Sequence, residues 1–472
     1  MKILFYLEPI TMLERPYLFA PIANDFIGDW FLNAFNTNEK YSKKLDVKLI
    51  VSQPVKEKIH INKDFQGVDI ISISQDEMFS PFEKGTHYTE IVNKATTRRL
   101  TDNQNTYYKN LILDKLKGWK PDIIMTINPS PQFIRDLDKD ILVLDLESAI
   151  FSRYPFMRSF YYDACGMGSN NFLNKYKDKI SKFKISKKEN QQIKYFKKQV
   201  KKELCKYNSV KKTISELRKK FKYVVLLPLQ FSGVPAIDTE MLFESQYACL
   251  TYVLDNVPKD CAVIATEHDF NMFVSKDNCA EKLKKKYPNF VHIEKMNAFN
   301  SASINFLPYI DGIINITSTT AIQALLFDIK IISLAKGFNN WMADAQGIDN
   351  IKEILKKPTR NKNNILYWYL THYVTLEKDV YNAEKVYKKL QGYLDKFKAE
   401  GINFSFYTKI NDMQEFSDYV IEYMRKKIRN KRLFSGLPFL EKIKNYIAKK
   451  LKNAGKLHRK SEEYLNIIKG KI

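Results

Sequence analysis

The sequence predicts an α/β protein with two Rossmann-like domains that face a cleft, followed by a basic, helical C-terminal tail. Short apolar runs rich in β-branched residues alternate with amphipathic stretches, as in parallel sheets covered by helices on both faces. A polar, Lys-rich segment divides these runs into two sets, and basic residues accumulate after residue 424. These three observations predict the two domains and the tail.

The apolar runs are the expected strands, and their alternation with helices favours right-handed βαβ units. The first set comprises Ile3–Leu7, Val47–Val51, Val68–Ile73, Ile123–Ile127 and Ile141–Leu146. The second set comprises Tyr223–Leu229, Ala262–Thr266, Val291–Ile293, Gly312–Ile316 and Ile329–Leu334. We therefore expect an N-terminal domain over residues 1–215, a C-terminal domain with crossing helices over 216–424, and the tail over 425–472.

The segment from about Lys175 to Lys222 joins the two sets and predicts one or two surface helices. Apolar residues recur in it at helical spacing, at Ile193, Phe196, Val200 and Leu204. Its lysines form either a solvated helix face or a dock for an acidic partner, and the pattern fits both.

The tail holds 16 Lys and Arg against 3 Glu, more than half of the net charge of +24. After Pro438, apolar residues fall on one face of a predicted helix, which favours an interfacial helix on an anionic membrane. The alternative is a helix that packs on the protein. Five cysteines without a CxxC pair fit a reducing compartment. We expect a cytoplasmic protein on the inner face of the membrane.

Several site classes leave no signature in the sequence. No GxGxxG follows the first strand, and no Walker loop, HExxH motif or zinc spacing is present. No motif typical of nucleic-acid binding accompanies the charge. These absences lead us to expect no cofactor and no nucleic-acid partner.

Four candidate sites follow predicted strands, where ligands bind in doubly wound sheets. Glu147 ends the strand at Ile141–Leu146, ahead of a loop with Asp163. It could act as a general acid or base, or cap a helix. Asp238 follows a turn after Gln230 and could be a nucleophile, a base or a helix N-cap.

The other two candidates lie in the second domain. Glu267 and His268 end a strand, and the His could bind phosphate or be structural. Thr317, Ser318, Thr319 and Thr320 end a strand where a helix begins, which indicates an anion site at the helix start. Plain helix capping is the alternative, although four hydroxyl residues exceed what one cap needs.

In order, these segments resemble bacterial capsule and lipopolysaccharide GT-B glycosyltransferases that use CMP-activated ulosonic acids, above all the retaining β-Kdo transferases. The resemblance covers roughly residues 120–340 and differs from the family pattern at Asp269, Ala321 and Gln323. The motifs that carry it are Asp145-Leu-Glu147, Pro228-Leu-Gln230, Thr266-Glu-His-Asp269 and the segment from Asn315 to Leu325.

The resemblance implies transfer of Kdo or a related sugar from a CMP-sugar donor to a glycan or lipid-linked acceptor, and it also implies that no metal ion is needed. Glu147 would activate the acceptor hydroxyl, Asp238 would attack the anomeric carbon, and His268 would stabilise the departing phosphate. The expected donor-binding residues are Gln230, Glu267, Thr317, Ser318 and Thr319. Two alternatives remain: an inverting, sialyltransferase-like enzyme, and a non-catalytic assembly protein that binds membrane or nucleic acid.

Overall fold

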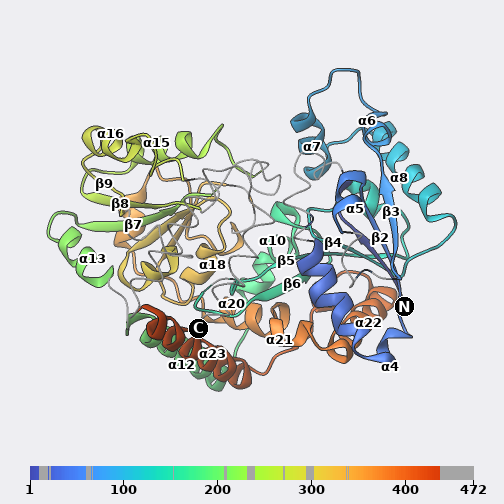
Figure 1. Cartoon of the computed structure of the whole chain (residues 1–472). Helices are drawn as coiled ribbons and strands as arrows, with labels where there is room; N and C mark the ends of the chain where they lie inside the picture. The colour runs from blue at the N-terminus through green and yellow to red at the C-terminus, as the bar shows by residue number, and fades with distance from the viewer. Residues whose placement is uncertain are drawn as a thin grey trace, which may run out of the picture.

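A computed structural model shows two sheets that lie side by side (Figure 1). It describes residues 1–9, 20, 23–59, 65, 67–152, 154–206, 210–230, 240–268, 272–293, 302–335, 337 and 340–435.

The first sheet has the strand order β13-β6-β5-β4-β1-β2-β3. Strands β1 to β5 are parallel and follow the Rossmann order 3-2-1-4-5, whereas β6 and β13 are antiparallel additions. Its strands are β1 (Lys2–Tyr6), β2 (Asp46–Ser52), β3 (Asp69–Ile73), β4 (Ile123–Thr126), β5 (Leu142–Ser148), β6 (Ser159–Asp163) and β13 (Thr375–Leu376).

The second sheet has the order β12-β11-β10-β7-β8-β9 and is parallel throughout. Counted from β7, this is the Rossmann order 3-2-1-4-5-6. Its strands are β7 (Tyr223–Pro228), β8 (Cys261–Thr266), β9 (Phe290–Val291), β10 (Gly312–Asn315), β11 (Lys330–Ser333) and β12 (Ala345–Gln346). The predicted fold class of two Rossmann-like domains is confirmed.

The helices of the first half are short, apart from α8, and several carry side-chain caps. Thr101, for example, caps α8, because its hydroxyl accepts from the backbone N–H of Gln104. In return, the backbone N–H of Thr101 donates to the side-chain carbonyl of Gln104. These helices are α3 (Asn33–Asn36), α4 (Glu39–Ser42), α5 (Gln53–Ile59), α6 (Gln75–Phe79), α7 (Tyr88–Thr96), α8 (Asp102–Leu116), α9 (Gln132–Arg135), α10 (Phe172–Lys175) and α11 (Lys177–Ser181).

The helices around the second sheet and along the chain that leaves it range from four to 23 residues in length. They are α12 (Lys187–Cys205), α13 (Val210–Arg218), α15 (Gln246–Asn256), α16 (Cys279–Lys286), α18 (Thr320–Ala324), α19 (Ile351–Lys356), α20 (Asn363–Trp368), α21 (Glu377–Val380), α22 (Ala383–Glu400) and α23 (Met413–Ser435). Two π-helical segments, at Asn24–Leu32 and Tyr369–Tyr373, and several 3₁₀ turns complete the described chain.

All ten predicted strands are present, and their observed ends differ from the predicted ones by no more than two residues. The strand β6 was not predicted, because its residues were expected to form a loop containing Asp163. The aromatic run before Asp163 is instead buried as an antiparallel return alongside β5. Asp163 therefore ends a strand, and this corrects the sequence-based expectation.

The predicted connecting helices are α12 and α13, with the shorter α10 and α11 before them. Their expected apolar face is confirmed, because Ile193, Phe196, Val200 and Leu204 are all buried. This face packs against α20 and α23, and Figure 1 shows α12 and α23 running together below the second sheet.

The C-terminal segment returns to the first sheet, since β13 pairs with β6 after the second sheet is complete. The expected boundary at residue 425 falls inside the continuous helix α23, and Arg425 donates to Glu203 of α12 at 2.9 Å. The start of the predicted tail thus packs on the protein. Residues 436–472, with the predicted interfacial helix, lie outside the described residues.

Adjacent residues on α12 provide a test of its packing. Phe196 is fully buried, whereas Tyr195 is 46% exposed. We expect Phe196→Ala to lower the free energy of unfolding by about 3–5 kcal/mol, because it leaves a cavity in the core. Tyr195→Ala should change it by less than about 0.5 kcal/mol. Chemical denaturation followed by circular dichroism measures both, and equal losses would show that α12 is not docked in solution.

Candidate functional site

The carboxyl end of the second sheet brings two predicted site residues into direct contact. Gln230 follows β7 and Thr317 follows β10, and these neighbouring strands are where the strand order reverses. The side-chain carbonyl of Gln230 accepts from the Thr317 hydroxyl at 2.8 Å and from its backbone N–H at 3.2 Å. Ligands bind at this topological switch point in open α/β sheets.

Gln230 is itself fixed from the other side. Its backbone N–H donates to the side chain of Gln246 at 2.9 Å, and Gln246 is buried at the start of α15. The Gln230 side chain remains partly exposed, as do Thr317, Ser318 and Thr319. The edge is therefore built rigidly and still presents polar groups to solvent.

The hydroxyl residues after β10 differ in how far the protein itself uses their side chains. The Ser318 hydroxyl accepts from the Thr320 backbone N–H at 3.3 Å and donates to the Thr320 hydroxyl at 3.0 Å. The helix that follows, α18, is only five residues long, and its N-cap residue is Thr319, whose side chain makes no capping hydrogen bond. Thr319 makes no side-chain hydrogen bond with the described residues.

A buried amide lies beside this edge. Asn315 ends β10 with no exposed surface, and neither amide atom has a hydrogen-bond partner in the described part of the chain. An unsatisfied buried polar group costs about 1–3 kcal/mol, so such groups are rare in folded proteins.

Glu267 and His268 follow β8, the strand next to β7. The Glu267 carboxylate is buried and accepts from the Val274 N–H at 2.6 Å and contacts His292 at 3.3 Å. Burial raises its pKa, but His292, the Ser275 hydroxyl and the Val274 N–H outweigh burial and lower it overall. Glu267 thus holds the loop beside His268 in place. His268 is partly exposed. The donor-binding role of Glu267 stays a prediction.

Glu147 lies at the carboxyl end of the first sheet, as the penultimate residue of β5. It is partly exposed, and burial raises the pKa of its carboxyl group, although the Ser148 N–H bonded to it at 2.7 Å lowers it. Among the described residues it forms no ion pair. A carboxyl group with a raised pKa near the surface is suited to proton transfer.

One hydrogen bond ties the two edges together. The buried side chain of Gln323 on α18 donates to the carbonyl of Ile150 at 2.9 Å, and Ile150 lies three residues after Glu147. Gln323 replaces the Glu of the family pattern, and a carboxylate could not donate this bond. Asp238 and Asp269 lie outside the described residues.

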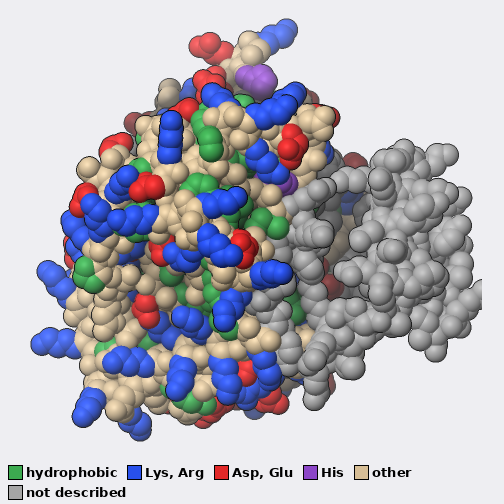
Figure 2. Space-filling view, turned by 90° about the vertical axis from the view of Figure 1, so that its left-hand side faces the viewer, with side chains coloured by type: hydrophobic (Ala, Val, Ile, Leu, Met, Phe, Trp, Pro, Cys, Tyr) green, Lys and Arg blue, Asp and Glu red, His purple; other side chains and the backbone are tan. Residues whose placement is uncertain are grey.

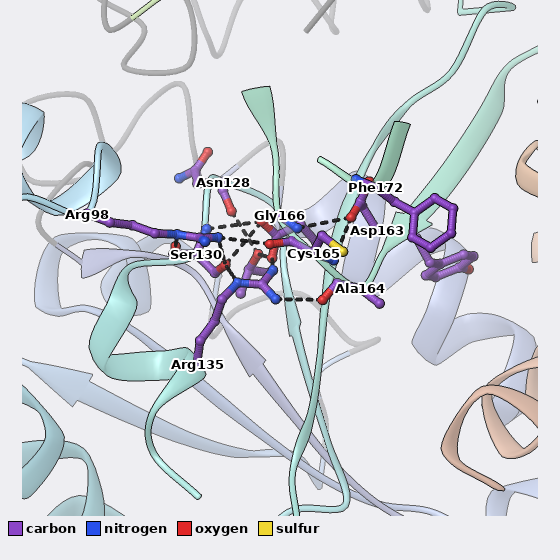
Figure 3. Close-up of polar contacts among 12 residues, drawn as sticks. Arg98, Asn128, Ser130, Arg135, Asp163, Ala164, Cys165, Gly166 and Phe172 are labelled. Atoms are coloured by element: carbon purple, nitrogen blue, oxygen red, sulfur yellow. Dashed lines mark hydrogen bonds and ion pairs between the residues drawn. The ribbon is translucent and has the colours of Figure 1, made fainter. Parts of the chain in front are cut away.

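The first half also contains a buried polar cluster that the sequence did not reveal. Asp145 is fully buried in the middle of β5 and forms an ion pair with Arg135 at 2.9 Å. Figure 3 shows Arg98 and Arg135 converging on Ser130, which follows β4. Asp145 accepts from the Ser130 N–H at 3.2 Å, so the cluster holds the loop after β4 against β5.

Asp163 belongs to the same region. It accepts from the backbone N–H groups of Cys165, Gly166 and Phe172 at 2.6–3.0 Å and from the Tyr373 hydroxyl. Burial raises its pKa to about 6, and these four donors oppose the rise. A charged residue within an apolar strand was the available signal for Asp145 and Asp163, because such a group needs a buried partner. Arg98 and Arg135 carried no such signal.

The carboxylate of Glu240 joins the two halves. Glu240 accepts from the Ser169 N–H at 2.8 Å, across 71 residues of sequence. It lies where side chains on Gly168 and Gly337 would be, since a Cβ on either would come within 2.4 Å of its carboxylate oxygens. Gly168 also has a φ of +61°, which favours glycine. These glycines therefore admit Glu240 between the halves.

Disulfide bonds, clusters of metal ligands and membrane-spanning helices are absent from the described residues. All five cysteines are free, and no group of three or more His, Cys, Asp or Glu in this part of the chain could hold a metal ion. Within the same residues, no helix has the length and apolar character to span a membrane.

Comparison with known proteins gives one family and several distant folds. The family model described as "Capsule polysaccharide biosynthesis protein" matches residues 152–400. No curated protein matches the sequence.

Three solved structures illustrate the distant similarity. A β-Kdo 2,7-transferase of KpsC from Thermosulfurimonas dismutans is 13% identical, with 65% of this chain and 98% of that chain covered and a TM-score of 0.37. The β-Kdo 2,4-transferase of KpsC from the same organism is 13% identical, with coverage of 52% and 76% and a TM-score of 0.35. A UDP-GlcNAc 2-epimerase from Methanocaldococcus jannaschii is 12% identical, with coverage of 78% and 98% and a TM-score of 0.30.

The buried pair can be tested against an exposed one. We expect Asp145→Asn to lower the free energy of unfolding by about 3–5 kcal/mol, because it leaves the Arg135 charge buried without its partner. Asp138 pairs with Lys120 at 2.6 Å on the surface, so Asp138→Asn should lower the free energy of unfolding far less. Denaturant titrations measure both variants, and a loss for Asp145→Asn no larger than for Asp138→Asn would contradict the role given to the pair.

Proposed function

Because this chain belongs to the family of capsule polysaccharide biosynthesis proteins, we propose that it is a glycosyltransferase of surface polysaccharide synthesis. The donor is a CMP-activated ulosonic acid, such as Kdo, and the acceptor is a glycan or glycolipid. The observation that carries this proposal is the contact between Gln230 and Thr317 at the switch point of the second sheet. Its neighbours, Thr319 and His268, leave partly exposed polar groups at the same edge.

Donor binding follows from the chemistry of that edge. Thr319 offers its hydroxyl group to a phosphate or a ribose, and Thr317, whose hydroxyl donates to Gln230, can still accept from a ribose hydroxyl. His268 donates a hydrogen bond to the departing phosphate and stabilises its charge. No metal ion takes part in this proposal.

Glu147, near the carboxyl end of β5, activates the acceptor in this proposal. The bond from Gln323 to Ile150 keeps the end of β5 close to the segment that follows Thr319. A carboxylate there removes the proton from the acceptor hydroxyl as the new glycosidic bond forms.

We assign the nucleophile of a double displacement to Asp238. In the first step its carboxylate forms a bond to the anomeric carbon while the bond to the CMP phosphate breaks. In the second step the acceptor oxygen displaces Asp238. An inverting enzyme needs no such intermediate, and the anomeric configuration of the product distinguishes the two courses: inversion would rule out this role for Asp238.

The positive charge fits an anionic donor and a membrane-linked acceptor. Figure 2 shows Lys and Arg side chains spread over one face of the second half, with fewer Asp and Glu. α16 contributes Lys282, Lys284, Lys285 and Lys286 to the exposed residues of this half. Together with residues 425–472, this charge would hold the protein at the anionic inner leaflet, where each Lys or Arg near the surface adds about 1 kcal/mol.

Nucleotide binding is the first test of the function. We expect CMP, without added metal, to raise the thermal unfolding temperature, because a ligand at about 100 times its Kd adds about 2.7 kcal/mol to stability. UMP, UDP and GDP should shift it less. Thr317→Val should remove the CMP shift, because it deletes the hydroxyl that meets Gln230. A larger shift with UDP or GDP would overturn the donor, and no shift with any nucleotide would favour a charge-driven assembly protein.

The role of Glu147 predicts a pH dependence of turnover. A base must be ionised, so kcat/KM should fall as the pH drops through the pKa of Glu147. Burial raises this pKa, so the fall should occur above the ordinary Glu value of about 4.3. Glu147→Gln should lower kcat by about 10²- to 10⁴-fold and abolish this limb of the profile. The CMP shift serves as the control and should persist; an unchanged pH profile would exclude Glu147 as the base.

A further inference from the structure

The exposed face of α12 carries lysines without acidic partners. Six lysines of this helix are exposed, on the side away from its buried apolar face, and none of them forms an ion pair with the described residues. They are Lys187, Lys188, Lys194, Lys198, Lys201 and Lys202. The two glutamates of α12 are used elsewhere. Glu203 is buried and pairs with Arg425 at 2.9 Å, and Glu189 lies 3.8 Å from the Lys409 ammonium.

α12 and α23 point their carboxyl ends the same way. The rings of Phe196 and Phe416 lie 6.1 Å apart, and Glu203 further along α12 pairs with Arg425 further along α23. The contacts therefore advance along both helices together. α23 ends at Ser435, so the chain continues into the basic residues 436–472 from the helix end that lies toward the carboxyl end of α12.

The two helices lie on the outside of the molecule. Figure 1 shows them side by side along its lower edge, and Lys and Arg side chains project from the lower part of the face in Figure 2. Lys426 and Lys427 of α23 are exposed and add to the charge of α12. The basic helix face and the start of the basic tail thus lie on one side of the protein.

The sign of the charge decides among the possible partners of this face. The tail and a second copy of α12 are both basic, so like charges would keep them away. An extended anionic plane, in contrast, can meet the α12 lysines and the start of the tail together. Tyr195 lies among these lysines and is 46% exposed. An exposed tyrosine suits the headgroup region of a membrane, where its apolar ring and its hydroxyl both find partners.

We propose that the exposed face of α12 lies against the anionic inner leaflet, in the same plane as the start of the tail. This inference rests on the proposed function, which holds the protein at that leaflet, and it names the surface that docks. Lysine side chains have long apolar stems and charged ends that can reach lipid phosphates. Because α12 packs on α20 and α23, docking through it fixes the orientation of the whole protein relative to the membrane.

Vesicle binding by the full chain tests the proposal. The probes are vesicles of phosphatidylglycerol mixed with phosphatidylcholine and vesicles of phosphatidylcholine alone, and co-sedimentation gives the apparent Kd. The test variant combines Lys194→Gln, Lys198→Gln, Lys201→Gln and Lys202→Gln. Each lysine near an anionic leaflet contributes about fivefold to binding, so the Kd for anionic vesicles should rise on the order of 100- to 1,000-fold.

A matched variant separates the α12 face from net charge. Lys58→Gln, Lys84→Gln, Lys117→Gln and Lys139→Gln together remove the same charge from the first half, where these lysines are exposed and form no ion pair among the described residues. Charges away from the lipid are screened by salt, so this variant should raise the Kd less than about threefold. Equal losses in the two variants would show that only net charge matters and would overturn the role of α12.

Contact with lipid supplies a second, independent readout. Tyr195 on α12 is 46% exposed and Tyr247 on α15 is 49% exposed, but α12 lies below the second sheet in Figure 1 and α15 lies above it. Brominated lipids quench tryptophans that reach the membrane. With anionic vesicles that contain such lipids, Tyr195→Trp should show more quenching than the wild-type protein, and Tyr247→Trp should not. No added quenching in Tyr195→Trp would contradict contact between this face and the membrane.

The outcomes also separate this proposal from the proposed function. The α12 variant should keep the CMP shift, which shows that it is folded. A wild-type protein that binds anionic vesicles no more tightly than neutral ones would overturn the proposal. If the α12 variant loses affinity for a duplex oligonucleotide but not for vesicles, the face belongs to a nucleic acid and the proposal is wrong. Absence of any CMP shift with vesicle binding intact would instead count against the glycosyltransferase function.

Discussion

One of the three hydrophobic clusters among the described residues runs between the two sheets and fixes the relation of their carboxyl edges. Ile3 and Phe5 of β1 belong to the same buried cluster as Val224 and Leu226 of β7. Helices α12, α20 and α23 supply further members of this cluster, so the chain that leaves the second sheet also holds the first. Because the strands are apolar on both faces, polar groups with a function are confined mainly to the strand ends.

Several polar contacts among the described residues cross between the halves near those ends. The amide of Gln323 donates to the backbone after β5, and the carboxylate of Glu240 accepts from the backbone after β6. The Asn174 side chain of the first half donates to the carbonyl of Gly337 in the second half at 3.3 Å. These contacts set the position of one edge against the other, and none of them uses the Glu147 side chain.

The buried charges of the first half serve a different purpose from those at the edge. Asp145 with Arg135, and Asp163 with its four donors, are satisfied by protein groups and hold the loops that follow β4 and β6. Arg98 shares this region but only neutral oxygens hold it. Charges that are satisfied by protein groups in this way can hold loops in place at little cost to stability.

The sequence by itself determined the ten predicted strands, the two Rossmann-like halves and the apolar face of α12, because periodicity and burial are local consequences of residue order. It also placed Gln230 and Thr317 at strand ends. Only the tertiary structure decided that these two side chains touch, that β6 returns alongside β5, and that Glu267 is committed to protein donors. Contacts such as Arg135 with Asp145, or Glu240 with Ser169, join residues on different elements, and sequence spacing carries no information about which strand ends meet. That depends on strand order, which is set by packing of the whole sheet.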